Sequence, residues 1–403
     1  MGDLNWAVIA RQYRAGLLED IVPFWLRHSL DRQCGGYLHH LDRDGSVWCT
    51  DKMMWMQGRE VWMFARLYNM VERREEWLEA SRLGADFLRR YGRDQDGDWF
   101  FLVDREGGPK RVAYNVFSDF FVVMGLSEYA AAAGESWALD LALETLRRIV
   151  RRRLNPKGRY SKLIPRADLP RDHAFPMIML NVARQLGPIA PSDEIDALGR
   201  AALERIMRMH HDAARRAVFE NVWDDGSRPD TPEGRLLNPG HAIESMSFVM
   251  DAAGADGDAG TVESAVDALL WMLARGWDRD FDGLFYFLDF GGRPPEALEW
   301  SMKLWWPHTE ALNALLLALR LTGRPELAEW FQRIHDYTWR TFPDPEHGGW
   351  FGYFDRRGNR THDLKGSKWK GFFHVPRGLL SCWRLADEIA GRPGDGSGSQ
   401  LVD

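Results

Sequence analysis

The sequence predicts an all-α protein: an (α/α)6 barrel of twelve helices with short β-hairpins or loops on one face. Three observations support this prediction. One pattern recurs six times, pairs of helix-like segments separate its copies, and the first and last copies resemble each other. The copies begin at positions 36, 98, 158, 217, 283 and 349, so their spacing stays between 59 and 66 residues. A near-constant period of this kind is typical of closed or stacked repeat architectures.

Each copy predicts a β-hairpin or an extended loop. The pattern is a small residue, an alternating run rich in aromatic residues, and then a turn containing Asp, Gly or Arg. The first copy reads GYLHHLDRDG over 36–45, and the last reads GWFGYFDRRG over 349–358. The third copy, over 158–163, is degraded. Alternation that ends in such a turn is the ordinary signature of a hairpin.

The segments between the copies predict pairs of helices, because their apolar residues recur at spacings of three and four. Leu312, Leu315, Leu316 and Leu319 show this spacing. A solenoid usually needs polar capping repeats, whereas this chain begins and ends in helix-like segments, so we expect a closed ring. The predicted helices span 3–29, 52–71, 74–92, 113–134, 135–153, 172–188, 192–212, 239–256, 260–275, 302–322, 325–342 and 371–390.

The composition is that of an ordinary soluble globular protein, with 403 residues, 45% of them hydrophobic and 28% charged. Stacked repeats share one core. We therefore expect a single barrel domain over 1–390, followed by a disordered tail over 391–403 that is rich in glycine and serine.

Charge and cysteine content limit the partners and the compartment. The net charge is −7 and the basic residues are dispersed, which argues against nucleic-acid binding. No stretch approaches the roughly 18 apolar residues of a membrane span, and the N-terminus has no apolar signal segment. The three cysteines have no metal-type spacing. We therefore expect a cytoplasmic protein without a membrane partner.

Closure of the ring would bring equivalent positions of the repeats to one level of one cavity. Arg59 and Asn181 lie 23 residues after the start of their copies, His241 lies 24, and His308 and His374 lie 25. A lone histidine is usually a core residue. Three of the chain's twelve histidines at one level instead indicate a functional site.

Two other kinds of site fit this level less well. Three histidines can hold zinc, but these come from separate repeats with no carboxylate-rich run beside them, so we predict no metal. Glycoside hydrolysis needs two carboxylates that face each other, whereas this level offers imidazoles. Imidazoles favour proton transfer at a carbon atom instead.

Charged neighbours of opposite sign predict different roles for His241 and His374. Glu244 follows His241 by three residues, and residues at this spacing share a helix face. We therefore expect Glu244 to orient His241 and to raise its pKa. Arg377 follows His374 by three residues and is expected to favour its neutral form or to bind substrate. Histidines with opposite neighbours suit an acid and a base that work near neutral pH.

Four motifs then resemble those of the N-acylglucosamine 2-epimerase family. They are WMQGR over 55–59, NPGHAIE over 238–244, KLWWPHTE over 303–310 and KGFFHVPR over 370–377. The resemblance runs from about Tyr13 to Trp383. It implies an (α/α)6 barrel and an isomerase that interconverts N-acetylglucosamine and N-acetylmannosamine. It also implies a homodimer, chemistry without a cofactor, and in some members a nucleotide such as ATP as an activator.

The resemblance also assigns roles by position. His241 and His374 are similar to the two acid/base histidines, and Arg59 to the group that binds the carbonyl and enediolate oxygens. The further expected supporting or substrate-binding residues are Glu244, Glu310, His308, Arg377, Trp305, Trp306 and Asn181.

The expected reaction begins at C2 of an opened sugar. One imidazole removes the C2 proton, Arg59 stabilises the cis-enediolate, and the second imidazole returns a proton from the other face. Two alternatives stay open. A free-sugar epimerase or an aldose–ketose isomerase acting on mannose, glucose or fructose would use the same groups. A non-catalytic sugar- or protein-binding barrel would not need the paired bases.

Overall fold

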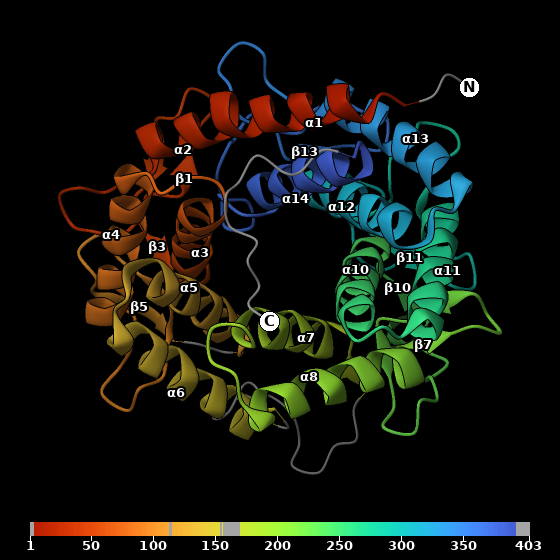
Figure 1. Cartoon of the computed structure of the whole chain (residues 1–403), viewed down its shortest axis with the longest axis horizontal. Helices are drawn as coiled ribbons and strands as arrows, with labels where there is room; N and C mark the ends of the chain where they lie inside the picture. The colour runs from red at the N-terminus through yellow and green to blue at the C-terminus, as the bar shows by residue number, and fades with distance from the viewer. Residues whose placement is uncertain (1–3, 113–114, 154, 156–169, 392–403) are drawn as a thin grey trace.

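A computed structural model describes residues 4–112, 115–153, 155 and 170–391. In this part of the chain the helices form an inner and an outer ring (Figure 1). The inner ring consists of α3 (Met54–Met70), α5 (Phe117–Ala133), α7 (Ala174–Leu186), α10 (Pro239–Ala255), α12 (Trp305–Thr322) and α14 (His374–Ile389). The outer ring consists of α4 (Glu75–Tyr91), α6 (Ser136–Arg152), α8 (Asp193–Arg205), α11 (Ala259–Gly276), α13 (Pro325–Thr341) and, at the start of the chain, α1 (Trp6–Ala15) with α2 (Val22–His28).

The two rings differ in how their residues are buried. In α5 every residue from 118 to 129 is buried, because the helix has neighbours on all sides. In α6 the buried positions include Ala138, Leu141, Thr145 and Ile149, which recur at spacings of three and four and form one stripe. An amphipathic stripe suits an outer helix, whereas an inner helix must be apolar on nearly every face.

A close approach of two inner helices lies beside one of the expected site residues. A Cβ atom on Gly58 would lie 2.4 Å from the carbonyl oxygen of Phe121, and one on Gly125 would lie 2.5 Å from that of Gly58. Only glycine permits this contact between the backbones of α3 and α5. The contact fixes the depth of Arg59, the next residue of α3.

The first helical segment closes the outer ring. It continues from α1 through the π-helical turn η1 (Gly16–Ile21) into α2, and α1 packs against α14 (Figure 1). A similar π turn, η3 (Ile206–His210), ends α8. Such turns absorb one extra residue in a helix. The short helix α9 (Pro232–Arg235) was not predicted from the sequence.

Short antiparallel strands join neighbouring repeats. Four pairs connect the segment that leads into an inner helix with the hairpin of the next repeat: β3–β4, β6–β9, β10–β11 and β12–β13. The remaining pairs, β1–β2, β4–β5 and β7–β8, are local. The strands are β1 (His40–Leu41), β2 (Val47–Cys49), β3 (Lys52–Met53), β4 (Phe100–Val103), β5 (Pro109–Val112), β6 (Arg171–Asp172), β7 (His211–Asp212), β8 (Ala217–Val218), β9 (Asn221–Val222), β10 (Leu236–Leu237), β11 (Leu288–Asp289), β12 (Lys303–Leu304) and β13 (Tyr353–Phe354).

The same connection closes the ring between the two ends of the chain. The backbone N–H groups of Lys365 and Gly366 each donate to the carbonyl of Leu41 at 3.0 Å. The N–H of Leu41 donates in return to the carbonyl of Gly366 at 3.2 Å. The first hairpin therefore holds the segment that leads into α14.

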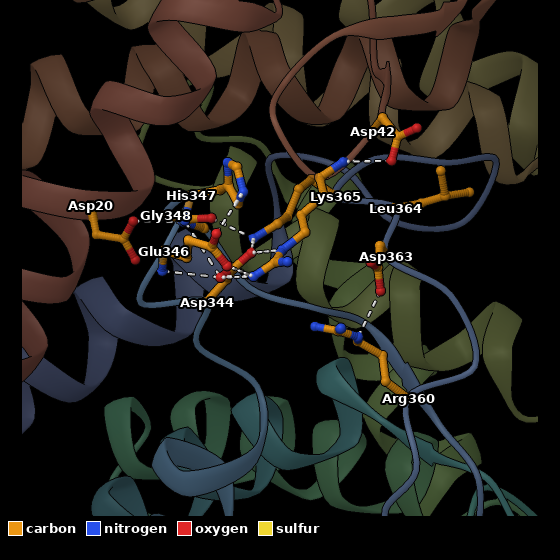
Figure 2. A network of polar contacts seen from close by, with 12 residues as sticks. Asp20, Asp42, Asp344, Glu346, His347, Gly348, Arg360, Asp363, Leu364 and Lys365 are labelled. Carbon is orange, nitrogen blue, oxygen red and sulfur yellow. Dashed lines mark hydrogen bonds and ion pairs between the residues drawn. The ribbon is translucent and has the colours of Figure 1, made fainter.

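A buried ion-pair cluster strengthens this closure. Lys365 Nζ donates to Asp344 at 2.8 Å, while Arg43 donates to both carboxylate oxygens of Asp344, at 2.8 and 3.0 Å. Figure 2 shows Asp344 and Lys365 within this network. Burial alone would raise the pKa of Asp344, but the hydrogen bonds from Arg43 and Lys365 hold that pKa well below its ordinary value.

Two other joints of the ring use the same set of residue types. In each, a buried Asp accepts a hydrogen bond from a buried Lys of its own repeat and a bidentate pair from an Arg of the next hairpin. These clusters are Asp31 with Lys52 and Arg105, and Asp278 with Lys303 and Arg356. Arg43, Arg105 and Arg356 all follow the Asp that ends a hairpin run.

The structure confirms the predicted fold class. A helix overlaps each of the twelve predicted spans within the described residues, with ends shifted by a few positions. The third hairpin copy, over 158–163, and the predicted tail beyond Gly391 lie outside the described part of the chain. None of the described helices combines the length and the apolar character that a membrane crossing requires.

The closure cluster predicts a large effect on stability. Asp344→Ala is expected to lower the free energy of unfolding by about 3–5 kcal/mol, because it leaves the buried Lys365 without its carboxylate. Urea denaturation followed by tryptophan fluorescence measures this. The control is Glu346→Ala, which removes an exposed partner of Arg43 and should cost less than about 1 kcal/mol. An equal loss of unfolding free energy in the two variants would contradict the role of the cluster.

Candidate active site

One pocket opens at the end of the barrel where the inner helices begin. Its volume is about 530 Å³. Among the described residues, each of the inner helices α3, α5, α7, α10, α12 and α14 contributes to its wall. Hairpin residues such as Tyr286 and Tyr353 complete it. The ring therefore brings helix N-terminal segments far apart in the sequence around one cavity.

His241 stands in the first turn of α10. The side chain of Asn238 caps this helix by accepting the N–H of His241 at 3.1 Å. The imidazole Nδ1 lies 2.8 Å from Oε1 of Glu220, which comes from the fourth hairpin. Burial lowers the pKa of His241, but Glu220, together with Glu244 and Asp172, outweighs it and leaves that pKa above its ordinary value.

His374 is the first residue of α14, and its Nδ1 lies 2.8 Å from Oε1 of Glu310. The same Glu310 oxygen accepts from Arg377 at 2.6 Å. Arg377 also donates to Glu244, so it connects α14 with both α12 and α10. Burial lowers the pKa of His374 well below its ordinary value, and the positive charges of Arg59 and Arg377 act in the same direction. The pKa values of the two pocket histidines are thus shifted in opposite directions.

Arg59 has no carboxylate within ion-pair distance among the described residues. Its guanidinium carbon instead lies 3.9 Å from the ring centroid of Phe121, 4.7 Å from that of Trp55 and 4.9 Å from that of Phe373. Only 7% of the residue is exposed, and this burial lowers its pKa to about 9. A buried cation without a partner is suited to an oxygen that becomes negative during a reaction.

Trp306 connects the two histidines. Its ring centroid lies 5.4 Å from that of His241 and 5.7 Å from that of His374. A Cβ atom on Gly240 would lie 2.4 Å from the Trp306 ring, so the glycine beside His241 makes room for the indole. Trp305 also lines the pocket and packs on Tyr353 at 5.0 Å between centroids.

The structure brings most of the predicted residues together. Glu310 stands directly behind His374 rather than at the wall. The predicted residues that line the pocket are Arg59, Asn181, His241, Glu244, Trp305, Trp306, His374 and Arg377.

Two expectations need correction. His308 is fully buried outside the pocket wall: its Nδ1 lies 2.6 Å from the carbonyl oxygen of Leu304, and its Nε2 accepts the N–H of Leu284 at 2.9 Å. Because the backbone occupies both ring nitrogens, His308 anchors the fifth hairpin instead of reaching a substrate. The partner expected for His241 also differs, since Glu244 bonds to Arg377 and Glu220 takes its place.

One trio of side chains, two at the pocket wall and one behind it, has the residue types of a metal site. Possible ligand atoms of Glu244, Glu310 and His374 lie within 4.8 Å of one another. Arg377, however, donates to both carboxylates and supplies the positive charge that they face. One oxygen of each carboxylate, Oε1, is therefore used in an ion-pair network. That the chain uses no metal stays a prediction.

Two further residues of the site, Glu220 and Tyr286, were not predicted from the sequence. Both are the fourth residue of their hairpin copies, which begin at 217 and 283. Tyr286 lines the pocket, and its ring centroid lies 6.1 Å from that of Trp306. The sequence signal for Glu220 was a carboxylate within an otherwise apolar run. Its position in the fourth copy is equivalent to that of the aromatic residue Tyr286 in the fifth.

Comparison with known proteins agrees with these motifs. The sequence profile described as N-acylglucosamine 2-epimerase matches residues 36–377. The N-acylglucosamine 2-epimerase of Bos taurus is 39% identical over 386 residues, which is 93% of this chain and 90% of the bovine protein. This chain belongs to the N-acylglucosamine 2-epimerase family.

Solved structures show the same fold at lower identity. Cellobiose 2-epimerase from Bacillus thermoamylovorans B4167 superimposes with a TM-score of 0.82 at 20% identity, over 94% of this chain and 99% of that one. A D-mannose isomerase superimposes with a TM-score of 0.80 at 16% identity, over 94% of this chain and 98% of its own. At these identities the likeness establishes the barrel alone.

The contact between His241 and Glu220 predicts a change in titration. Glu220→Gln should lower the pKa of His241, because a charge-assisted hydrogen bond becomes a neutral one. As the pH rises, the variant imidazole then loses its proton earlier than that of the unmodified protein. Proton NMR of the histidine ring signals measures this, with His241→Asn to assign the signal.

The matched control is Glu299→Gln, which removes a carboxylate from the same pocket without touching His241. An unchanged His241 titration in Glu220→Gln, or an equal change in both variants, would contradict the assignment of Glu220.

Proposed function

We propose that this chain interconverts N-acetylglucosamine and N-acetylmannosamine by removing and returning the proton at C2. The observation that supports this most strongly is the pair of pocket imidazoles. Each is held at Nδ1 by a carboxylate, and their pKa values are shifted in opposite directions. An acid and a base at one carbon need this difference at neutral pH. Family membership supports the choice of substrate.

In the proposed step His374 is the base and His241 the acid. Among the described residues neither imidazole has a hydrogen-bond partner at Nε2, so these nitrogens are free for a substrate. His374 takes the C2 proton of the open-chain sugar, and the electron pair of the C–H bond moves through C1 to the carbonyl oxygen. His241, protonated at rest, then gives a proton to C2 from the other face. The reverse reaction begins with the two protonation states exchanged.

Arg59 is proposed to stabilise the intermediate. The oxygen on C1 becomes negative when the proton leaves, giving an enolate, or an enediolate when C2 carries a hydroxyl group. Of the two arginines that line the pocket, Arg59 has no carboxylate partner among the described residues, so its charge is available to that oxygen. Glu310 in turn stabilises the imidazolium that forms at His374, because it already contacts Nδ1.

Further properties are proposed from the family resemblance. They are a homodimer, a nucleotide such as ATP that activates without reacting, and chemistry that needs no cofactor. A single catalytic domain over 1–390 is proposed from the repeats, since stacked repeats share one core. A cytoplasmic location is supported by Cys34, Cys49 and Cys382, which are all free.

Proton NMR in D2O tests the reaction and separates the substrates. With N-acetylmannosamine, we expect deuterium at C2 and the appearance of N-acetylglucosamine. Mannose serves as the comparison sugar, since a proton returned to C1 of its intermediate would give fructose. Turnover of mannose without turnover of N-acetylmannosamine would contradict the proposal and indicate a free-sugar isomerase. A folded protein that turns over neither sugar would leave only the binding role.

A further inference from the structure

One side of the pocket is lined mainly by apolar side chains that have no part in the proposed proton transfer. It consists of Phe117 and Phe121 on α5, Met177 and Ile178 on α7, and Phe248 on α10. We refer to these five residues as the apolar lobe. In the ring α5, α7 and α10 are successive inner helices (Figure 1). The acid/base groups come from the first turn of α10 and from α14.

The apolar lobe adjoins the groups that act on the sugar. The ring centroid of Phe121 lies 3.9 Å from the guanidinium carbon of Arg59, and that of Phe248 lies 5.6 Å from the guanidinium carbon of Arg377. Phe248 also follows Glu244 by one helical turn on α10, so the two share a face. A substituent on the carbon that reacts beside Arg59 therefore has the lobe within reach.

Among the described residues that line the pocket, a single one carries a side-chain amide, Asn181. Asn181 follows Met177 by one turn of α7 and is 8% exposed. Its Oδ1 accepts from Nε2 of Gln185 at 2.8 Å, which fixes the orientation of the amide. The amide nitrogen has only a thioether partner among the described residues, Sδ of Met124 at 3.9 Å. It thus keeps an N–H free for a better acceptor.

We propose that the apolar lobe receives the acyl group carried by the nitrogen on C2. The acyl carbon chain lies against Met177, Ile178 and Phe248, and Asn181 donates to the acyl oxygen. This inference rests on the proposed function and names the feature that selects N-acylated over free sugars. In a free sugar, a C2 hydroxyl would meet apolar atoms without a hydrogen-bond partner, and the amide nitrogen of Asn181 would keep only its thioether partner.

The test compares acyl chains of different length. C2 deuterium exchange by NMR gives kcat/KM for N-acetyl-, N-propanoyl- and N-butanoylmannosamine, with mannose as the sugar without an acyl group. The variants are Met177→Ala and Ile178→Ala, which enlarge the lobe. The matched control is Met302→Ala, the same change at a pocket residue in the segment that leads into α12. Ratios between substrates cancel any loss of folded protein.

Each buried methylene changes affinity about fourfold. Met177→Ala should therefore raise the N-butanoyl to N-acetyl ratio of kcat/KM by about tenfold, and Ile178→Ala should shift it in the same direction. Met302→Ala should leave the ratio within about twofold. A ratio that moves equally in all three variants, or in none, overturns the assignment of the lobe.

Two results with the unmodified protein separate this inference from the proposed function. Exchange of mannose as fast as that of N-acetylmannosamine overturns acyl selection while the epimerase proposal stands. Absence of exchange with every N-acylmannosamine overturns the proposed function, and the assignment of the lobe falls with it.

Discussion

The site depends on the closure of the helical ring between the first hairpin and the segment before α14. Backbone hydrogen bonds join Leu41 to Lys365 and Gly366, and the buried carboxylate of Asp344 binds Arg43 and Lys365 beside them. His374, which is the proposed general base, follows Gly366 by only eight residues. Without this closure α14 would be held by α12 and α1 and by the ion pairs of Arg377, but not by the repeat that carries α3 and Arg59. The ion pairs that stabilise the fold therefore also set the geometry of the chemistry.

Inside the pocket, the balance of charge explains the two protonation states. Arg377 is shared by Glu244 and Glu310, while Arg59 is surrounded by aromatic rings. With His374 neutral and His241 protonated, the positive and negative charges of this group are equal; its members are Arg59, Arg377, Glu244, Glu310, Glu220, His241 and His374. A cavity lined by buried ions is most stable near neutrality, since an uncompensated buried charge is costly. The resting state that the reaction needs is thus the one that the surrounding charges favour.

The sequence predicted most of this arrangement because the repeat length is nearly constant. Counting from each hairpin identified Arg59, His241 and His374, and all three line one pocket. The spacing gave the wrong residue in the fifth repeat, where it pointed to His308. The residue that lines the pocket there is Trp306, which lies 23 positions after the start of its hairpin. A step of two residues along an α-helix rotates the side-chain direction by about 200°. His308 therefore points away from the pocket, toward the outer ring, and stacks on Tyr337 of α13. Spacing along a helix also could not reveal Glu220, because its contact with His241 joins a hairpin to a helix.

The most direct test of two bases on opposite faces of C2 uses His241→Asn with each epimer in D2O. With one imidazole left, His374 can still remove the C2 proton of one of the two sugars and return deuterium to the same face. The predicted result is deuterium at C2 of that starting sugar with its configuration retained and almost none of the other epimer. Epimer formation at the rate of the unmodified protein would contradict the account.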